Sequence, residues 1–181
     1  TEHLLDASMA EDNCHAPLLP NVRMRWSADQ AAIIYSIWLY DQNNGTSLAN
    51  ELRDKWRSYM ESRMRDHGTG LYMTEVMGVK RYSKQPRGCA LAYLIYYSSH
   101  FAPQMAAEQW GLFKRHMFIK RAGITGFREY LPSYKGGWTP DSGPIVAGIG
   151  VGASGLALKT AACMADTEVY DALNRSVAPV M

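Results

Sequence analysis

The sequence predicts an all-α protein built from three helix hairpins, each with an apolar inner helix followed by an amphipathic outer helix. Three segments that are apolar on nearly every side alternate with segments that have one apolar and one charged face. The order of loop, apolar helix and amphipathic helix occurs three times, and Thr69-Gly70 recurs as Thr125-Gly126. The chain has 181 residues, 47% hydrophobic and 20% charged, which is typical of one globular domain.

The inner helices are the apolar segments, which must be covered by protein on all sides. They are predicted at residues 31–40 and 89–97 and from Pro144 to about Met164. The length of the third segment and its alanine and leucine content favour helix over strand. The single α/α domain is expected to consist of an irregular N-terminal segment (1–26), a first hairpin (27–67), a second hairpin with its loop (68–118) and a third hairpin with its loop (119–181).

The outer helices are recognised by their amphipathic pattern. In residues 48–64 the apolar side chains, among them Leu52 and Trp56, recur every three or four residues, and charged side chains fill the other face. Pro103 suits the first turn of the second outer helix. Asp166 is placed to cap the third.

Composition excludes several classes of function. The net charge is only +2 and the basic residues are scattered among acidic ones, so we expect no nucleic-acid partner. The cysteines and histidines show no metal-ligand spacing, and the glycines of residues 148–152 follow no predicted strand, so neither a metal site nor another cofactor is predicted. The apolar run at residues 145–158 is too short and too glycine-rich for a membrane span, so the chain is not expected to be transmembrane.

The chain begins at Thr1 and shows no leader-like segment, so we expect a processed protein or a piece of a longer one. Cysteine usage does not fix its compartment. If the longer protein is anchored in a membrane, this part is expected to be extracytoplasmic.

Two loop-plus-helix segments, residues 125–130 and 141–146, resemble uncharacterised bacterial proteins of the (α/α)6-toroid class. Glycoside hydrolases, polysaccharide lyases and the linalool dehydratase-isomerase group use that architecture. A full toroid has six hairpins, so the resemblance implies that three hairpins form half of an (α/α)6-barrel-like array. The chain does not match the catalytic cysteine pattern of the linalool enzyme, so that activity is not carried over.

The resemblance also implies a ligand site, because the loops that enter the inner helices line one mouth of a toroid. Cleavage of a sugar requires two carboxyl groups, one protonated and one ionised. The candidates for this acid–base role are Asp141, Glu129, Glu75 and Asp29. The candidates for substrate binding are Trp26, Arg87, Arg128, Tyr130, Tyr134 and Trp138.

Each candidate also has a structural interpretation. Asp141 could serve only as a helix N-cap, and Glu75 and Glu129 could pair with nearby arginines, Arg81 or Arg128, to tie down a loop. Arg87 could bind a carboxylate or phosphate, or bridge Asp29 and Asp141.

The expected function is that of a carbohydrate-active hydrolase or lyase, or an inactive fragment of one. The first alternative is a non-catalytic helical-repeat module that binds a glycan or protein or serves assembly. The second is a terpenoid-type or other small-molecule lyase, which would need an apolar cavity. Unpaired inner helices would expose an apolar wall, so we expect self-association or a missing N-terminal half.

Overall fold

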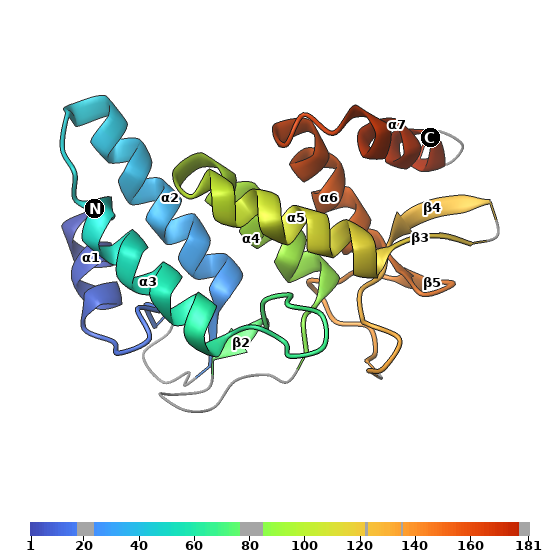
Figure 1. Cartoon of the computed structure of the whole chain (residues 1–181), viewed down its shortest axis with the longest axis horizontal. Helices are drawn as coiled ribbons and strands as arrows, with labels where there is room; N and C mark the ends of the chain where they lie inside the picture. The colour runs from blue at the N-terminus through green and yellow to red at the C-terminus, as the bar shows by residue number, and fades with distance from the viewer. Residues whose placement is uncertain (18–23, 77–84, 122, 135, 178–181) are drawn as a thin grey trace.

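The structure is a computed structural model that describes residues 1–17, 24–76, 85–121, 123–134 and 136–177. Its described part contains seven helices and three two-stranded antiparallel sheets, so the predicted all-α class is wrong and the chain is mostly helical (Figure 1). The helices are α1 (Glu2–Met9), α2 (Ser27–Asn44), α3 (Ala49–Arg63), α4 (Gly88–Phe101), α5 (Pro103–Met117), α6 (Val151–Cys163) and α7 (Thr167–Val177). The strands are β1 (Arg25–Trp26), β2 (Glu75–Val76), β3 (Phe118–Arg121), β4 (Ile124–Phe127), β5 (Ile145–Val146) and β6 (Ile149–Gly150).

Helix α4 is the centre of the fold. It packs against α2 on one side and α6 on the other, and its hairpin partner α5 also lies against it (Figure 1). Its side chains Leu91, Ala92 and Ile95 are buried, as expected of a helix that is apolar nearly all round. The outer helices α3 and α5 each bury one stripe, centred on Trp56 and Phe113.

The third inner helix is shorter than predicted. It begins at Val151 rather than at Pro144, because residues 145–150 form the hairpin β5–β6. The turn of this hairpin places Ala147 and Gly148 at φ 53° and 83°. Two successive residues in the left-handed region close a two-residue hairpin turn and interrupt a helix. Gly148 thus lies in a turn and not in a helix.

The other two sheets were also missed. Strands β3 and β4 form a hairpin in which Phe118 is opposite Phe127, and both rings contact each other at the edge of the core. Strands β1 and β2 join distant segments, with Trp26 opposite Glu75. Short strands of two residues leave too little alternation in the sequence to be recognised by pattern.

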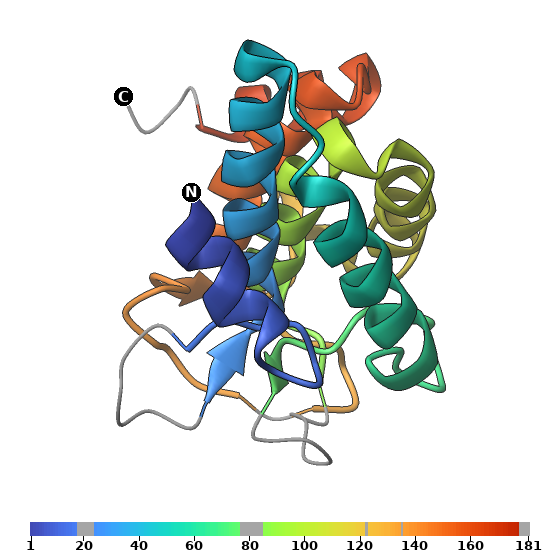
Figure 2. The same cartoon turned by 90° about the vertical axis from the view of Figure 1, so that its left-hand side faces the viewer.

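The N-terminal segment expected to be irregular contains a helix. Figure 2 shows α1 lying beside α2 and α3, which it contacts. The buried imidazole of His15 follows it and accepts a hydrogen bond from the indole of Trp56 at 3.3 Å. No helix in the described part of the chain combines the length and apolarity needed to cross a membrane.

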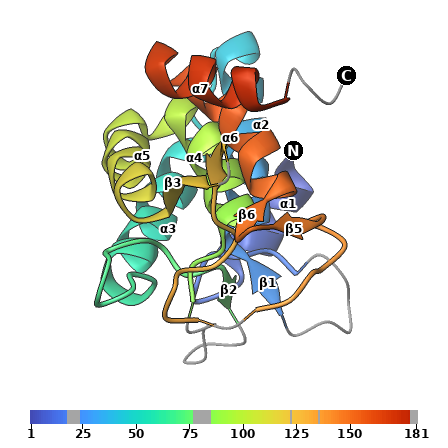
Figure 3. The same cartoon turned by 90° about the vertical axis from the view of Figure 1, so that its right-hand side faces the viewer.

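The sheet β1–β2 lies at the end of the molecule where α2 and α4 begin (Figure 3). Pairing of the two strands brings the start of α2 beside the segment that leads into α4. The loop between β4 and β5 passes the same end of α4, because Arg87 bridges to Tyr130 there. The segments that lead into α2 and α4 and the loop between β4 and β5 therefore meet at this end of the fold.

Candidate functional site

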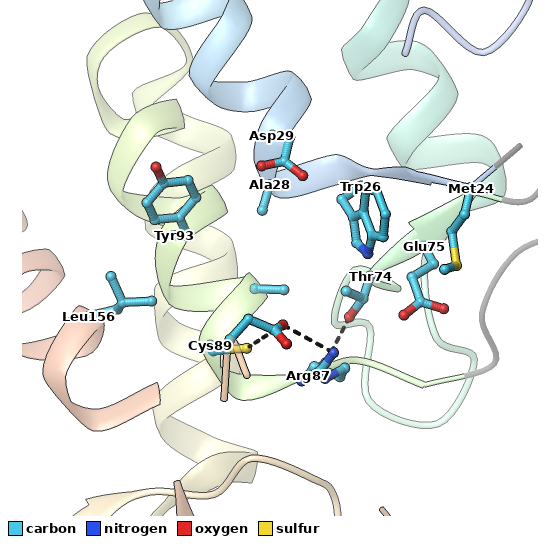
Figure 4. A pocket seen from close by; sticks show the side chains of 12 residues that line it. Met24, Trp26, Ala28, Asp29, Thr74, Glu75, Arg87, Cys89, Tyr93 and Leu156 are labelled. Carbon is cyan, nitrogen blue, oxygen red and sulfur yellow. Dashed lines mark hydrogen bonds and ion pairs between the residues drawn. The ribbon is translucent and has the colours of Figure 1, made fainter. Parts of the chain in front are cut away.

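An open pocket of about 540 Å³ lies where these loops meet. In Figure 4, Trp26 and Tyr93 stand on opposite sides of the pocket, with Asp29 between them at the start of α2. Arg87 and Cys89, at the start of α4, lie on the side away from Asp29. The pocket is lined by Met24, Trp26, Ala28, Asp29, Thr74, Glu75, Arg87, Cys89, Ala90, Tyr93, Asp141 and Leu156.

The base of the pocket is fixed by a buried ion pair. Arg87 Nε donates to Glu129 Oε1 at 3.0 Å, and the Glu129 side chain is fully buried. The backbone N–H of Cys89 donates to Glu129 Oε2 at 3.1 Å, and that of Gly88 donates to the Glu129 carbonyl at 2.9 Å. N–H groups in the first turn of a helix have no partner within the helix, and a negative charge beside them is stabilising. Glu129 therefore caps α4 from outside.

Close packing holds the two segments together. A Cβ atom added at Gly88 would come within 2.1 Å of the carbonyl oxygen of Arg128. Only glycine lets the start of α4 approach the 128–130 segment this closely. The position of Arg87 is thus set by backbone contacts as well as by its ion pair.

Asp141 is the second carboxylate held by Arg87. Its Oδ2 lies 3.2 Å from Arg87 Nη1, while Nη2 of the same guanidinium donates to Thr139 Oγ1 at 2.6 Å. Partial burial opposes ionisation of Asp141, but hydrogen bonds from Thr139 and its own backbone, and the Arg87 charge, outweigh burial and lower its pKa. Its side chain keeps 63% of its surface exposed, so it is an ionised carboxylate at the pocket rim.

Asp29 faces the opposite electrostatic situation. Within the described part of the chain it makes no hydrogen bond or ion pair through its side chain. Burial, together with the negative charge of Asp141, raises its pKa. The pocket therefore contains two aspartates whose environments favour opposite protonation states.

Cys89 contacts both carboxylates on its side of the pocket. Its Sγ lies 3.1 Å from Glu129 Oε1 and 3.8 Å from Asp141 Oδ2. Because both carboxylates contact the same sulfur atom, they lie no further apart than the two catalytic carboxyl groups of glycosidases, which are separated by roughly 5–10 Å. Burial and the charge of Glu129 raise the pKa of the thiol well above its usual range. A thiol held in its protonated form is a hydrogen-bond donor and a poor nucleophile.

Several structural interpretations of these residues are now decided. Asp141 is not the N-cap of an inner helix, because α6 begins ten positions later at Val151, with Gly150 at the N-cap. Glu129 pairs with Arg87 and not with Arg128. Arg87 does form a bridge, but it joins Glu129 and Asp141, and Asp29 takes no part. The proposed partner of Glu75, Arg81, lies outside the described residues.

The other predicted binding residues are dispersed. The ring of Tyr130 lies below the Arg87 guanidinium at 5.7 Å, and its hydroxyl donates to the Gly137 carbonyl at 3.1 Å. Arg128 bridges to Ile149 through its backbone. Tyr134 packs on the core and donates to Asp66 Oδ1 at 3.3 Å, and Trp138 is 64% exposed. None of these four lines the pocket, in contrast to Trp26, Glu75, Asp29, Arg87 and Asp141.

Sequence reasoning missed Cys89, Tyr93 and the threonines that position Arg87. Cys89 and Tyr93 lie in the apolar segment of α4 and were assigned to the core. The backbone N–H of Arg87 donates to Thr74 Oγ1 at 3.0 Å, and Thr139 Oγ1 accepts a hydrogen bond from the Arg87 guanidinium. Residues so far apart in sequence give no local pattern.

No protein-family model and no curated protein matches this chain. Membership of the toroid class therefore stays a prediction. Among the described residues, no group of three or more histidine, cysteine, aspartate or glutamate side chains is arranged to hold a metal ion.

Proposed function

We propose that this pocket binds a saccharide and cleaves a glycosidic bond by acid–base catalysis, with Asp29 as the acid and Asp141 as the base. The observation that carries the proposal is the opposite direction of the two pKa shifts in one pocket. Environments that push the pKa values of two neighbouring carboxyl groups apart are how acid and base roles are divided in glycosidases.

The roles follow from the surroundings of each group. Asp29 is half-buried beside a negative charge that raises its pKa, so it takes up a proton more readily than Asp141 and in that form donates it to the oxygen of the leaving sugar. Asp141, stabilised as a carboxylate by Arg87, activates a water molecule or attacks the sugar directly. Trp26 and Tyr93 stand on opposite walls and offer aromatic faces to the apolar faces of a sugar ring.

The geometry favours a hydrolase over a uronate lyase. A lyase must neutralise the carboxylate of its substrate, for which Arg87 was the candidate. Its guanidinium is occupied by Glu129, Asp141 and Thr139. Among the described lining residues, no second basic side chain is present to take its place.

Release of reducing ends from a mixture of oligosaccharides tests the proposal. We expect the wild-type chain to release them and both Asp29→Asn and Asp141→Asn to reduce the rate at least about a hundredfold, as expected for loss of general acid–base catalysis. Asp171→Asn, an exposed carboxylate on α7, is the matched control and should leave the rate unchanged. Turnover that survives both pocket substitutions would refute the assignment.

A second candidate function is a small-molecule lyase of the terpenoid type. It is favoured by the apolar part of the lining, formed by Met24, Ala28, Ala90 and Leu156. An apolar ligand that displaces a pocket-bound fluorescent dye when no saccharide does so would support it.

A non-catalytic binding module would instead bind saccharide without turnover, and Asp141→Asn would then change affinity alone.

The toroid prediction adds a proposal about assembly. Between α2 and α4 lies a half-buried aromatic cluster in which Tyr35 contacts Trp38, Tyr97 and His100 at ring-centroid distances of 4.7–5.8 Å. Such a surface supports association with a second copy or with another half of a toroid. Light scattering should show an assembly larger than the monomer. A strict monomer that binds no apolar dye would contradict the proposed association.

A further inference from the structure

The hydroxyl groups of Tyr93 and Tyr97 form a directed hydrogen bond beside the pocket. The two residues lie one helical turn apart on the same face of α4, and their ring centroids are 4.7 Å apart. The Tyr97 O–H donates to the Tyr93 oxygen at 3.1 Å. Tyr93 lines the pocket and Tyr97 does not. The hydrogen bond therefore joins a wall of the pocket to a residue outside it.

The direction of this bond leaves the proton of Tyr93 available. A phenol hydroxyl has one proton to donate and lone pairs with which to accept. Because Tyr97 donates its proton to Tyr93, the proton of Tyr93 points to another acceptor, and no protein group in the described part of the chain accepts it. The Tyr93 side chain is half-buried, with its hydroxyl at the end of the ring away from Cys89 (Figure 4). This O–H group is therefore a donor open to a ligand.

The surroundings of Tyr97 fix the orientation of that donor. The Tyr97 ring contacts Tyr35 and Tyr96, at centroid distances of 5.3 and 5.1 Å, so its hydroxyl stays next to Tyr93. The hydrogen bond to Tyr93, together with burial, raises the pKa of Tyr97 to about 12, so Tyr97 keeps its proton at neutral pH. A hydroxyl that accepts one hydrogen bond is polarised and becomes a stronger donor in the next. Tyr97 thus acts on the pocket through Tyr93.

A directed hydroxyl donor selects the chemistry of the ligand. Sugars offer hydroxyl, ring and carbonyl oxygens as acceptors, whereas a hydrocarbon offers none and leaves a desolvated donor unpaired, which costs free energy. The hydroxyl of Tyr93 lies at the edge of its ring and not on its face. The acceptor oxygen therefore belongs to a part of the ligand that extends past the stacked sugar face.

We infer that Tyr93 donates a hydrogen bond to an oxygen of the bound saccharide and that Tyr97 is the positioning residue that directs this bond. The inference rests on the proposed function and names the group that selects an oxygen-bearing ligand over an apolar one. The ring of Tyr93 keeps its role as the wall opposite Trp26, and its hydroxyl adds a specific contact to that wall.

Isothermal titration calorimetry of the whole chain with tetramers of glucose, N-acetylglucosamine and xylose tests the inference. We expect at least one tetramer to bind, and Tyr93→Phe to weaken the tightest of them about three- to tenfold, as the loss of one hydrogen bond does. Tyr97→Phe should weaken it by a similar factor, although Tyr97 does not line the pocket. Tyr170→Phe, at an exposed tyrosine on α7, is the matched control and should bind as tightly as the wild type.

A chain that carries both substitutions separates an orienting role of Tyr97 from a packing role. If Tyr97 acts through Tyr93, the double variant binds no more weakly than Tyr93→Phe alone. Losses that multiply in the double variant, or a Tyr97→Phe chain that binds as the wild type does, would overturn the positioning role. Phenylalanine keeps each ring in place, and circular dichroism checks that all variants fold.

The outcomes distinguish this inference from the proposed function. If a tetramer binds and Tyr93→Phe does not weaken it, the inference is overturned and saccharide binding stands. If the variants behave as expected but the wild-type chain releases no reducing ends, the inference stands and the proposed cleavage is refuted. If no tetramer binds, the inference falls together with the proposed function on which it rests.

Discussion

Arg87 and Glu129 form the buried ion pair on which the pocket is built, with Nε 3.0 Å from Oε1 and the glutamate side chain fully buried. The pair links the segment before α4 to the segment after β4. It also leaves the remaining guanidinium nitrogens free to bind Thr139 and Asp141. A structural interaction thus holds a candidate catalytic carboxylate in place.

The first prediction concerns removal of that pair. Glu129→Gln removes the buried counter-charge of Arg87 and leaves it only the exposed Asp141, and breaking a buried ion pair typically costs about 3–5 kcal/mol. Urea unfolding should show this loss in the free energy of unfolding. Glu168→Gln, at an exposed site on α7, should change it by less than about 0.5 kcal/mol. An equal effect of the two substitutions would mean that the pair does not anchor the pocket.

The second prediction uses two helical glycines in different surroundings. A Cβ at Gly88 would come within 2.1 Å of a backbone oxygen, whereas one at Gly111 in α5 would meet nothing within 4 Å. Gly88→Ala should therefore destabilise the fold by about 1–3 kcal/mol. Gly111→Ala should stabilise it by about 0.5–1 kcal/mol, because alanine favours the helix. Thermal melts of both variants test this, and a tolerated Gly88→Ala would contradict the observed packing.

The third prediction contrasts two aspartates. Asp29→Asn should raise stability at neutral pH, because the amide removes a half-buried charge that Asp141 repels. Asp41→Asn should cost about 1 kcal/mol. The Asp41 carboxylate accepts the backbone N–H groups of Leu48 and Ala49 with separate oxygens, and an amide has only one. Chemical denaturation should show opposite signs, and a loss of stability in Asp29→Asn would argue against an electrostatically strained pocket.

The fourth prediction is a loss of stability in acid caused by His15. Burial, opposed by a hydrogen bond to the Asn13 backbone, lowers its pKa from 6.5 to about 4. Below pH 6.5 the unfolded chain binds a proton that the folded chain refuses, so this contribution to stability is full above 6.5 and falls as the pH drops toward 4. The slope for one proton is at most about 1.4 kcal/mol per pH unit.

Unfolding measured across this pH range checks the prediction. His15→Gln should remove this component of the pH dependence, while substitution of the exposed His67 should not. An unchanged pH profile in His15→Gln would assign the acid sensitivity to other groups.

The sequence pattern was sufficient to predict the long helices but not the short strands. Apolar and amphipathic periodicity placed α2, α3, α4 and α5 close to their observed positions, and Asp166 as a cap placed the start of α7. The hairpin β5–β6 was missed because its residues, Ile145 to Gly150, continue the apolar composition of α6. What separates them is the left-handed turn at Ala147 and Gly148, and an alanine gives no signal for that conformation.

The residues of the site were predicted only in part, because a sequence pattern does not show which side chains meet across the fold. Asp29, Arg87 and Asp141, which the sequence assigned to the starts of inner helices, line one pocket, although Asp141 precedes α6 by ten residues. The pattern could not distinguish Glu129, which is buried and caps α4, from a carboxylate open to a ligand. That distinction depends on which side chains meet across the fold, and Trp138 and Tyr134 lie away from the pocket for the same reason.

Separate titration of Asp29 and Asp141 by carbon-13 NMR of their side-chain carboxyl groups tests the division into acid and base directly. Asp29→Asn and Asp141→Asn assign the two signals. We expect the pKa of Asp29 to lie above the usual range of aspartate and that of Asp141 to lie below it. Two carboxyl groups that titrate together at the ordinary pKa, or in the reverse order, would contradict the division into acid and base.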